Sequence, residues 1–549
     1  MGNVNSSFGV EIEFVVAIQR GTEPRAKPRM FQQARSNPII FEDTPESNWW
    51  LEYGPLAITT IRERIEQALV GHTGDRVINS PAELLGDMNA WHLREYATNW
   101  DVKRDLSVVM DPKYAEGDSN FNNYTWMNIE LATPALRATD ASYAEIHHVI
   151  TTLRETFWMI APKSAGLHIH YGRGRNYIPP DDFRKIAALL YAADPILTQL
   201  HPSVRREEGR RWCNSNRLYS NLAHGMTRLD AETIIEASGL AIAPESEPAT
   251  GPASEVSNVD RVARPTLERG DNFISIFPRG SLEGYIFSKE DFSMGYHPFL
   301  RERGRHLENR DMTPVGIIQG AQEILSCESS PVVAVLMSFG AYSRLAYNVN
   351  AYGPDYYRRL VNVGGHPSPD RQPKRTIEFR QPAGTVDADE IIAHAKVVVR
   401  LCEYASSTSN EELWKTISDL ALGEENSEWY DVFDFLVDLG LQEEARVIQR
   451  QLANFRGLEI IDEERGLSRD PNAPPPSPKQ SDTISYLCRL LSSLSLGGSS
   501  RQTSPERTEP QVIRGSRRGY RVEEEHASNP SGDDLLWLEF GTEGPVLPD

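Results

Sequence analysis

The chain has 549 residues, of which 39% are hydrophobic and 25% are charged, values that are ordinary for a soluble globular protein. Its 57 basic and 78 acidic residues give a net charge of −21, which disfavours general binding of nucleic acid or anionic membranes. The four cysteines form no C-x-x-C pair, which argues against a disulfide framework or a structural zinc site. No apolar run reaches the roughly 20 residues that span a bilayer, and no secretory signal opens the sequence. We therefore expect a soluble, cytoplasmic protein with no nucleic-acid or membrane partner.

The period of the apolar residues predicts interspersed strands and helices. Strand-like alternation occurs at residues 8–18, 100–110 and 126–131. Residues 332–349 are strongly apolar and are predicted to form a helix followed by a strand. Helical periodicity, in places with a capping residue at the start, occurs at residues 58–70, 140–159, 180–200, 387–404, 411–422, 429–439 and 442–455.

Composition divides the chain into a folded domain and a tail. Residues 1–463 are expected to form one catalytic domain, with an exposed insertion at 241–258, where Pro, Ala, Ser and Glu dominate without periodicity. Residues 464–549 carry little packable sequence, so we expect them to be a disordered tail of low complexity. The end of this tail is acidic and lacks Lys and Arg, and a protein partner could bind there.

Three segments far apart in the chain carry polar residues at alternate positions within apolar sequence, at 9–14, 166–172 and 375–381. Because side chains alternate between the two faces of a strand, the polar residues of each segment point to one face. A sheet face that carries carboxylates, imidazoles and a guanidinium is costly unless ions lie on it. Divalent cations and phosphate would satisfy such a face.

The carboxylates in these segments allow two interpretations. Glu11 and Glu13 could both coordinate divalent cations, which prefer hard oxygen ligands, or they could simply form the solvated face of a strand. Glu130 could be a further ligand or a half-exposed glutamate. Glu378 and Arg380 could form an ordinary ion pair, or could bind a cation and a phosphoryl oxygen respectively.

The remaining candidates are histidines and arginines. His168 and His170 face the same way and both need partners, which metal ligation or a phosphate would supply. Arg205 and Arg206 lie in an arginine-rich stretch after a predicted helix and could bind nucleotide phosphates, although a solvated loop is the alternative. The chain has no phosphate-binding glycine loop and no G-x-S-x-G motif, so a bound nucleotide would depend on carboxylate-held metals and arginines.

Five motifs resemble those of the amidoligase family of carboxylate–amine ligases, whose members are related in fold to glutamine synthetase and glutamate–cysteine ligase. In the family's order, they lie at residues 9–14, 100–107, 129–134, 166–170 and 376–385. Each motif alone is modest, but five in order are specific, and the last is the strongest. One departure is Pro382, because family members often carry a histidine there before the Gly-Thr pair.

The resemblance implies an α+β fold, with a glutamine synthetase-like curved antiparallel sheet and helices packed on its outer face. The concave face would hold ATP and two or more Mg²⁺ ions. ATP would phosphorylate a small-molecule or peptide carboxylate, and an amine would attack the acyl phosphate to form an amide. By the same resemblance, the metal ligands would be Glu11, Glu13, Glu130, His168 and Glu378. Arg380 would stabilise the transferring phosphoryl group, and we expect Glu378 and His170 to act in catalysis with it.

Two other functions remain open from the sequence. A metal-dependent hydrolase could use the same carboxylates and histidines around a water molecule. It would be active without ATP, whereas a ligase would release ADP only with a carboxylate acceptor. A non-catalytic binding module on the same fold is the third possibility, although the complete set of in-phase charged residues argues against it.

Overall fold

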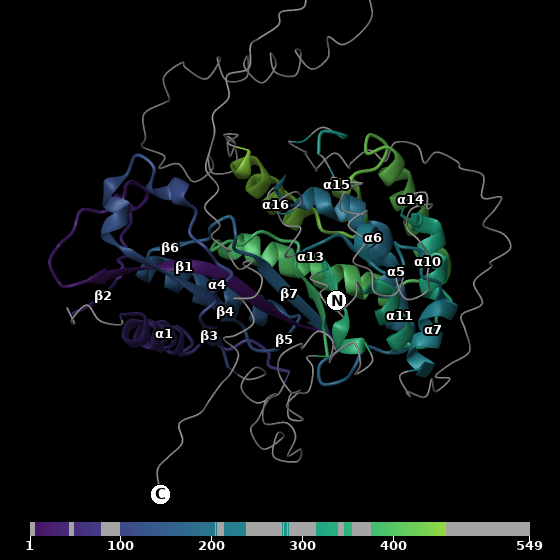
Figure 1. The fold of residues 1–549 in the computed structure, drawn as a ribbon, viewed down its shortest axis with the longest axis horizontal. Helices are drawn as coiled ribbons and strands as arrows, with labels where there is room; N and C mark the ends of the chain where they lie inside the picture. Colours follow the sequence, from purple (N-terminus) through teal and green to yellow (C-terminus); the bar gives the residue numbers. More distant parts are fainter. Residues whose placement is uncertain are drawn as a thin grey trace, which may run out of the picture. The chain divides into compact units, whose positions relative to one another are not determined.

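The computed structural model describes residues 6–42, 49–77, 99–203, 205, 213–237, 277, 279–282, 284, 314–338, 345–353 and 375–456. Figure 1 shows their helices and strands in sequence colours. The expected insertion at 241–258, the expected tail at 464–549 and Arg206 lie outside these residues. Among the described helices, none has the length and apolar character needed to cross a bilayer.

One long strand, β1 (Ser7–Arg20), organises a nine-stranded sheet (Figure 1). The strand order is β3-β4-β1-β7-β9-β8, so the sheet is open at β3 and β8. These neighbours are β3 (Asp101–Lys103), β4 (Thr125–Ala132), β7 (Leu167–Gly172), β8 (Tyr347–Asn348) and β9 (Ile377–Phe379). Three short strands also pair with β1, namely β2 (Ile39–Phe41), β5 (Leu136–Arg137) and β6 (Met159–Ile160). All pairings are antiparallel except that of β1 with β2.

Helices cover one face of the sheet. Val10, Ile12 and Phe14 alternate along β1 and are fully buried toward this face. The helix α13 (Ala388–Ser407) contacts β1 and β7, and α1 (Trp49–Ala68) contacts β2 and β3. The helix α4 (Asp140–Thr156) packs against both α1 and α13. Apolar strand residues at alternate positions therefore explain how this layer forms, and they leave the polar positions on the opposite face.

A second helical group surrounds α5, which is buried along most of its length and contacts α10, α13 and α14. The α-helices are α1 (Trp49–Ala68), α4 (Asp140–Thr156), α5 (Pro180–Leu197), α6 (Asn216–Tyr219), α7 (Arg228–Ala237), α10 (Ile317–Leu325), α11 (Ser330–Met337), α13 (Ala388–Ser407), α14 (Asn410–Glu425), α15 (Val432–Asp438) and α16 (Gln442–Phe455). Short 3-10 helices occur at Arg29–Phe31, Pro112–Ala115, Ser119–Asn123, Thr198–Leu200 and Asn350–Tyr352.

Aromatic side chains cover part of the face opposite the helices. Phe121 stacks on Trp126 at 4.6 Å between ring centroids, and Phe31 stacks on Trp158 at 4.9 Å. Val15 belongs to the same apolar cluster. Because Val15 lies two residues beyond Glu13 on β1, this cluster adjoins the charged part of the same face, where the polar positions gather.

The fold confirms a mixed α/β architecture with a large, mainly antiparallel, open sheet; the specific likeness to glutamine synthetase stays a prediction. The clearest difference between the predicted and the observed elements concerns residues 100–110. Their pattern resembles that of a strand, but only Asp101–Lys103 form one. The carboxylate of Asp105 accepts a hydrogen bond from the backbone N–H of Ser107 at 2.7 Å. A side chain that bonds to the backbone two residues on favours a turn, so the strand ends there.

Candidate active site

The strand register brings the predicted polar residues onto one face of the sheet. Glu13 lies directly opposite Glu130, Glu11 opposite His168, and His170 opposite Glu378. Residues directly opposite each other on neighbouring antiparallel strands share a face. Segments that are hundreds of residues apart in the sequence thus contribute to one surface.

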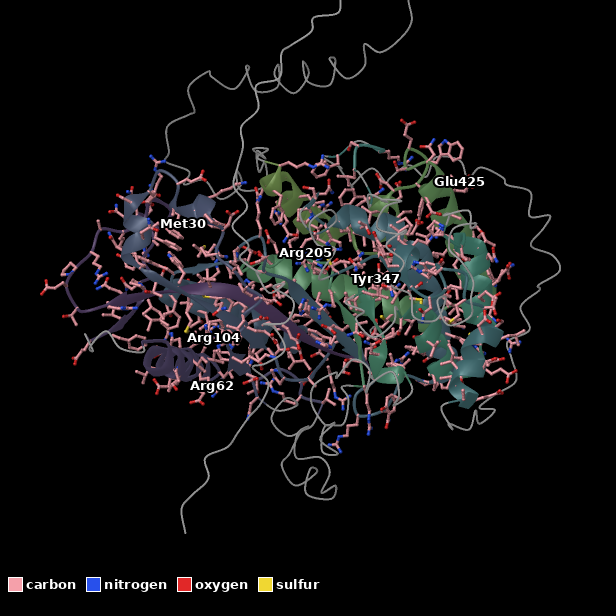
Figure 2. All side chains as sticks on the ribbon, viewed as in Figure 1. Met30, Arg62, Arg104, Arg205, Tyr347 and Glu425 are labelled. Carbon is pink, nitrogen blue, oxygen red and sulfur yellow. The ribbon has the colours of Figure 1, made fainter. Side chains whose placement is uncertain are left out.

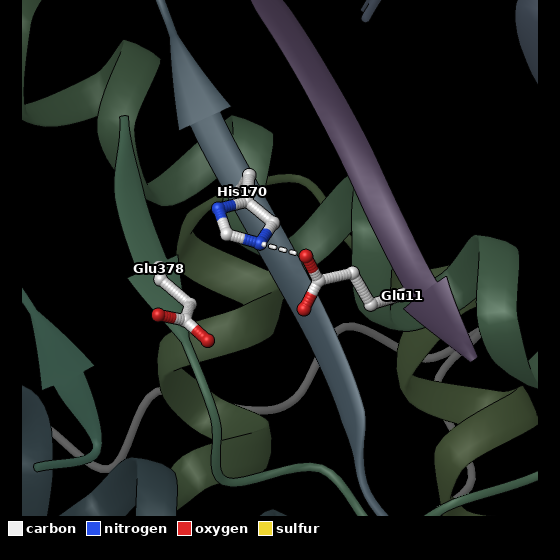
Figure 3. A group of neighbouring side chains, drawn as sticks. All are labelled: Glu11, His170 and Glu378. Carbon is white, nitrogen blue, oxygen red and sulfur yellow. Dashed lines mark ion pairs between the residues drawn. The ribbon is translucent and has the colours of Figure 1, made fainter. Parts of the chain in front are cut away.

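Glu11, His170 and Glu378 form the first of two clusters, called here the β7 cluster. They come from β1, β7 and β9, and their side chains point toward one another (Figure 3). His170 Nε2 lies 3.1 Å from Glu11 Oε1. Each residue offers a ligand atom within 4.8 Å of those of the other two, a spacing that a single metal ion could bridge. The other ring nitrogen of His170 is 3.1 Å from the hydroxyl of Thr376, which fixes the ring orientation.

Glu13, Asp105 and Glu130 form the second cluster, the β4 cluster, again with ligand atoms within 4.8 Å of one another. The backbone N–H of Gly166 donates to Glu13 Oε2 at 2.6 Å. Lys103, opposite Glu130 on the edge strand β3, places its Nζ 2.8 Å from Glu130 Oε1. No role was predicted for Asp105, although it lies in the motif at 100–107 and two residues beyond Lys103. Its place in that motif is the signal that could have revealed it, since β3 ends at Lys103 and strand alternation does not extend to Asp105.

His168 lies between the two clusters. Its Nδ1 is 3.4 Å from Glu11 Oε2 and 3.8 Å from Glu378 Oε1, both in the β7 cluster. Its Nε2 is 3.7 Å from Glu13 Oε1 in the β4 cluster. The two ring nitrogens of one imidazole therefore face different clusters, which makes His168 the common neighbour of both.

Arg380 and Glu378 form a half-buried ion pair at one side of the β7 cluster. The other carboxylate oxygen of Glu378 accepts a hydrogen bond from Asn348 Nδ2 at 2.9 Å. Burial alone would raise the pKa of Glu378, but Arg380 and the two imidazoles hold it down at about 2. Burial lowers the pKa of Arg380, yet the neighbouring carboxylates, Glu378 first, raise it above its ordinary value. Both groups are therefore charged at neutral pH.

The carboxylates of the β4 cluster are crowded and poorly solvated. Burial, together with the charge of Asp105, raises the pKa of Glu13 to about 8. Burial and the charge of Glu11 raise the pKa of Glu130 to about 7. Burial also lowers the pKa of His168, and the Arg380 guanidinium lowers it further. Without a cation, such carboxylates reduce their mutual repulsion by holding protons.

The donor set fits divalent cations. The β4 cluster offers only carboxylate oxygens, the hard ligands that Mg²⁺ and Mn²⁺ prefer, and the β7 cluster adds one imidazole. Within the described part of the chain, these two are the groups of three or more His, Cys, Asp and Glu side chains that could hold a metal ion. Every predicted metal ligand belongs to a cluster except His168, which lies between them; all the roles remain predictions.

Arg205 (labelled in Figure 2) is buried beside this site, and two of its guanidinium nitrogens donate to backbone carbonyls. Its Nη2 donates to the carbonyl oxygen of Arg380 at 2.7 Å, and its Nε to that of Gln381 at 3.3 Å. The predicted contact of Arg205 with nucleotide phosphate stays a prediction. The companion prediction for Arg206 falls outside the described residues.

Comparison with known proteins agrees with the family expected from the motifs. Residues 5–221 match the model of a family described as "Putative amidoligase enzyme". The resemblance to an amidoligase family is thereby confirmed over this range, which contains β1, β4 and β7. The match supports a ligase. Searches of curated proteins and of solved structures returned no match.

Proposed function

We propose that this protein is an ATP- and Mg²⁺-dependent carboxylate–amine ligase that forms an amide or peptide-like bond through an acyl phosphate. The observation that carries the proposal is the convergence of two carboxylate clusters and the half-buried Arg380 on one sheet face. Each is a group that phosphoryl transfer requires, because this chemistry depends on positioning reactants and neutralising charge.

The charge balance of the site supports binding of an anion together with metal ions. Among the residues that the structure describes, the five carboxylates of the two clusters lie beside three fixed cations, Lys103, Arg205 and Arg380. Two divalent cations would reverse the sign of this charge and make the site attractive to a polyphosphate. A hydrolase that activates only a water molecule has less need of a guanidinium in the site, so Arg380 favours the ligase.

In the proposed reaction, an oxygen of the substrate carboxylate attacks the γ-phosphorus of ATP, and ADP leaves. Magnesium ions in the two clusters would neutralise charge on the phosphates. The guanidinium of Arg380 would donate to the transferring phosphoryl oxygens, for which its planar fork is suited. The amine then attacks the acyl carbon, phosphate leaves, and the nitrogen loses a proton. Burial of the side chains around the site would limit hydrolysis of the acyl phosphate.

A nucleotide-release screen tests the proposal. The purified protein is incubated with ATP and Mg²⁺ and with pairs drawn from amino acids, short peptides, polyamines and ammonia, and ADP is measured. We expect ADP release that requires a particular carboxylate, with an amide as the second product. Cleavage of amides without ATP would instead establish the hydrolase, and ADP release independent of any acceptor would contradict a ligase.

A further inference from the structure

Two contacts anchor the main chain that follows the catalytic strand β9. Arg205 bonds to the carbonyl oxygens of both Arg380 and Gln381, as described above. Arg205 is itself fixed, because its backbone N–H donates to Pro202 O at 2.9 Å and its carbonyl accepts from Cys213 Sγ at 3.2 Å. Only 5% of Arg205 is exposed, so these bonds form away from competing water.

The second anchor holds the side chain of Gln381. Its Nε2 donates to Asp194 Oδ1 at 2.9 Å and lies 3.2 Å from Thr198 Oγ1. Asp194 is fully buried, and its other oxygen accepts bonds from the Ser215 hydroxyl and from the backbone N–H of Arg217. Asp194 is thus a fixed point in α5 to which the segment after β9 is tied.

From these contacts we infer that Arg205 is a positioning residue that holds the backbone of Arg380, and that it is not a nucleotide ligand. The bond between Gln381 and Asp194 is the second support of the same segment. The inference rests on the proposed function, which assigns Arg380 to the phosphoryl group. The side chain of Arg380 is flexible, so its backbone has to be fixed if the guanidinium is to keep its productive position. A displacement of about 1 Å can lower the rate roughly 100-fold. The backbone N–H of Arg380 adds a bond to Ala346 O at 2.9 Å, which completes the support.

Arg205 also couples this support to the β4 cluster. A Cβ atom at Gly166 would lie 3.1 Å from Arg205 Nη2 and 2.9 Å from His168 Nε2, so the glycine permits this close approach. Gly166 donates its N–H to Glu13, and the charge of Arg205 acts on the same carboxylate. Arg205 therefore contacts the backbone on one side of the site and lies beside the carboxylates on the other.

The test uses the full chain and compares Arg205→Met with the control Arg184→Met. Arg184 is equally buried and also donates to a carbonyl, that of Cys327 at 3.1 Å, but it lies outside the site.

Hydrogen exchange of the segment 377–384 is measured in the protein without ligands. We expect exchange at Arg380, and at Gly384, whose backbone N–H donates to Ala165 O at 2.8 Å, to become at least about tenfold faster in the Arg205 variant alone, because local opening controls exchange. Unchanged exchange overturns the inference, whichever reaction the protein catalyses. Should Arg205→Met fail to fold, Arg205→Lys, which cannot bond to both carbonyls in the same way, replaces it.

Steady-state kinetics with ATP give the second measurement. A positioning role predicts that kcat falls about 10- to 100-fold while KM for ATP changes less than about threefold. A rise of KM for ATP by tenfold or more at nearly normal kcat would make Arg205 a nucleotide ligand and overturn the inference. Because the exchange measurement needs no turnover, absence of ATP-dependent activity in the wild type would count against the proposed function alone.

Discussion

At the scale of single residues, Glu13 and Glu130 show why this site calls for cations. They face each other on adjacent strands, both are buried, and their pKa values are raised to about 8 and about 7. The folded protein therefore retains protons that the unfolded chain loses at lower pH. The stability due to these protons is fully present below pH 4.5, and it is lost as the pH rises through the two raised pKa values.

This linkage predicts how metal binding depends on pH. A divalent cation in the β4 cluster displaces the protons of Glu13 and Glu130, so its affinity rises with pH. We expect the increase in melting temperature caused by Mg²⁺ or Mn²⁺ to be clearly larger at pH 8 than at pH 6, as measured by differential scanning fluorimetry at fixed metal concentration. In Glu130→Gln this pH dependence should weaken. Equal metal-induced shifts at both pH values in the wild type would speak against cation binding by these carboxylates.

Glu378 and Arg380 give the second residue-scale prediction. Both Glu378→Ala and Arg380→Ala should reduce turnover by about 100-fold or more, because each removes charge stabilisation that the phosphoryl transfer needs. The circular dichroism spectrum should stay native. Lys415→Met serves as the control. Lys415 lies on α14 and forms an exposed ion pair with Glu412 at 3.8 Å, so its replacement should leave turnover unchanged. Near-normal activity of either site variant would show that the assigned roles are wrong.

At the scale of the elements, Glu145 connects α4 to the chain that enters β3. Its side chain is buried on α4 and accepts hydrogen bonds from Trp100 Nε1 and Arg76 Nη1, each at 2.8 Å, and from the backbone N–H of Gly74. Trp100 directly precedes β3, the strand that carries Lys103. A helix residue thereby fixes the path of the segment that supplies Asp105 to the site.

Replacing Glu145 tests this connection. Glu145→Gln should lower the free energy of unfolding by about 2–4 kcal/mol, because an amide cannot accept all these bonds and leaves buried donors unsatisfied. Urea unfolding followed by fluorescence gives the value. Glu155→Gln is the same chemical change at an exposed position on the same helix and should cost less than about 0.5 kcal/mol. Similar costs in the two variants would rule out the connecting role.

Several elements could be predicted from the sequence because their apolar residues recur at the regular spacing of a helix or a strand. The predicted strand at 126–131 and helix at 180–200 correspond to β4 and to α5 with its 3-10 extension. The predicted helix at 140–159 ends at Thr156 instead, where the chain turns into the extended stretch before β6. Such ends depend on hydrogen bonds to distant backbone, as between Asn37 N–H and Thr156 O at 3.0 Å, which periodicity does not encode.

At the scale of the whole molecule, the site depends on pairings that span much of the sequence. The family match ends at residue 221, yet Glu378 completes the β7 cluster from β9, more than one hundred residues later. The alternation within each strand predicted which residues share a face. It could not predict that His170 lies opposite Glu378, because register between distant strands is set by tertiary packing. Asp105 was missed for the related reason that it follows a strand and does not belong to it.

The most direct test of the central claim is anomalous diffraction from crystals grown with Mn²⁺ and a non-hydrolysable ATP analogue. Manganese replaces magnesium because it prefers the same ligands and scatters anomalously. We predict peaks at the β7 and β4 clusters, about 2.0–2.3 Å from oxygens of Glu11, Glu13 and Glu378, with the triphosphate between the metals and Arg380. Manganese bound only elsewhere, or Glu13, His168 and Glu378 facing separate surfaces in the crystal, would contradict the account.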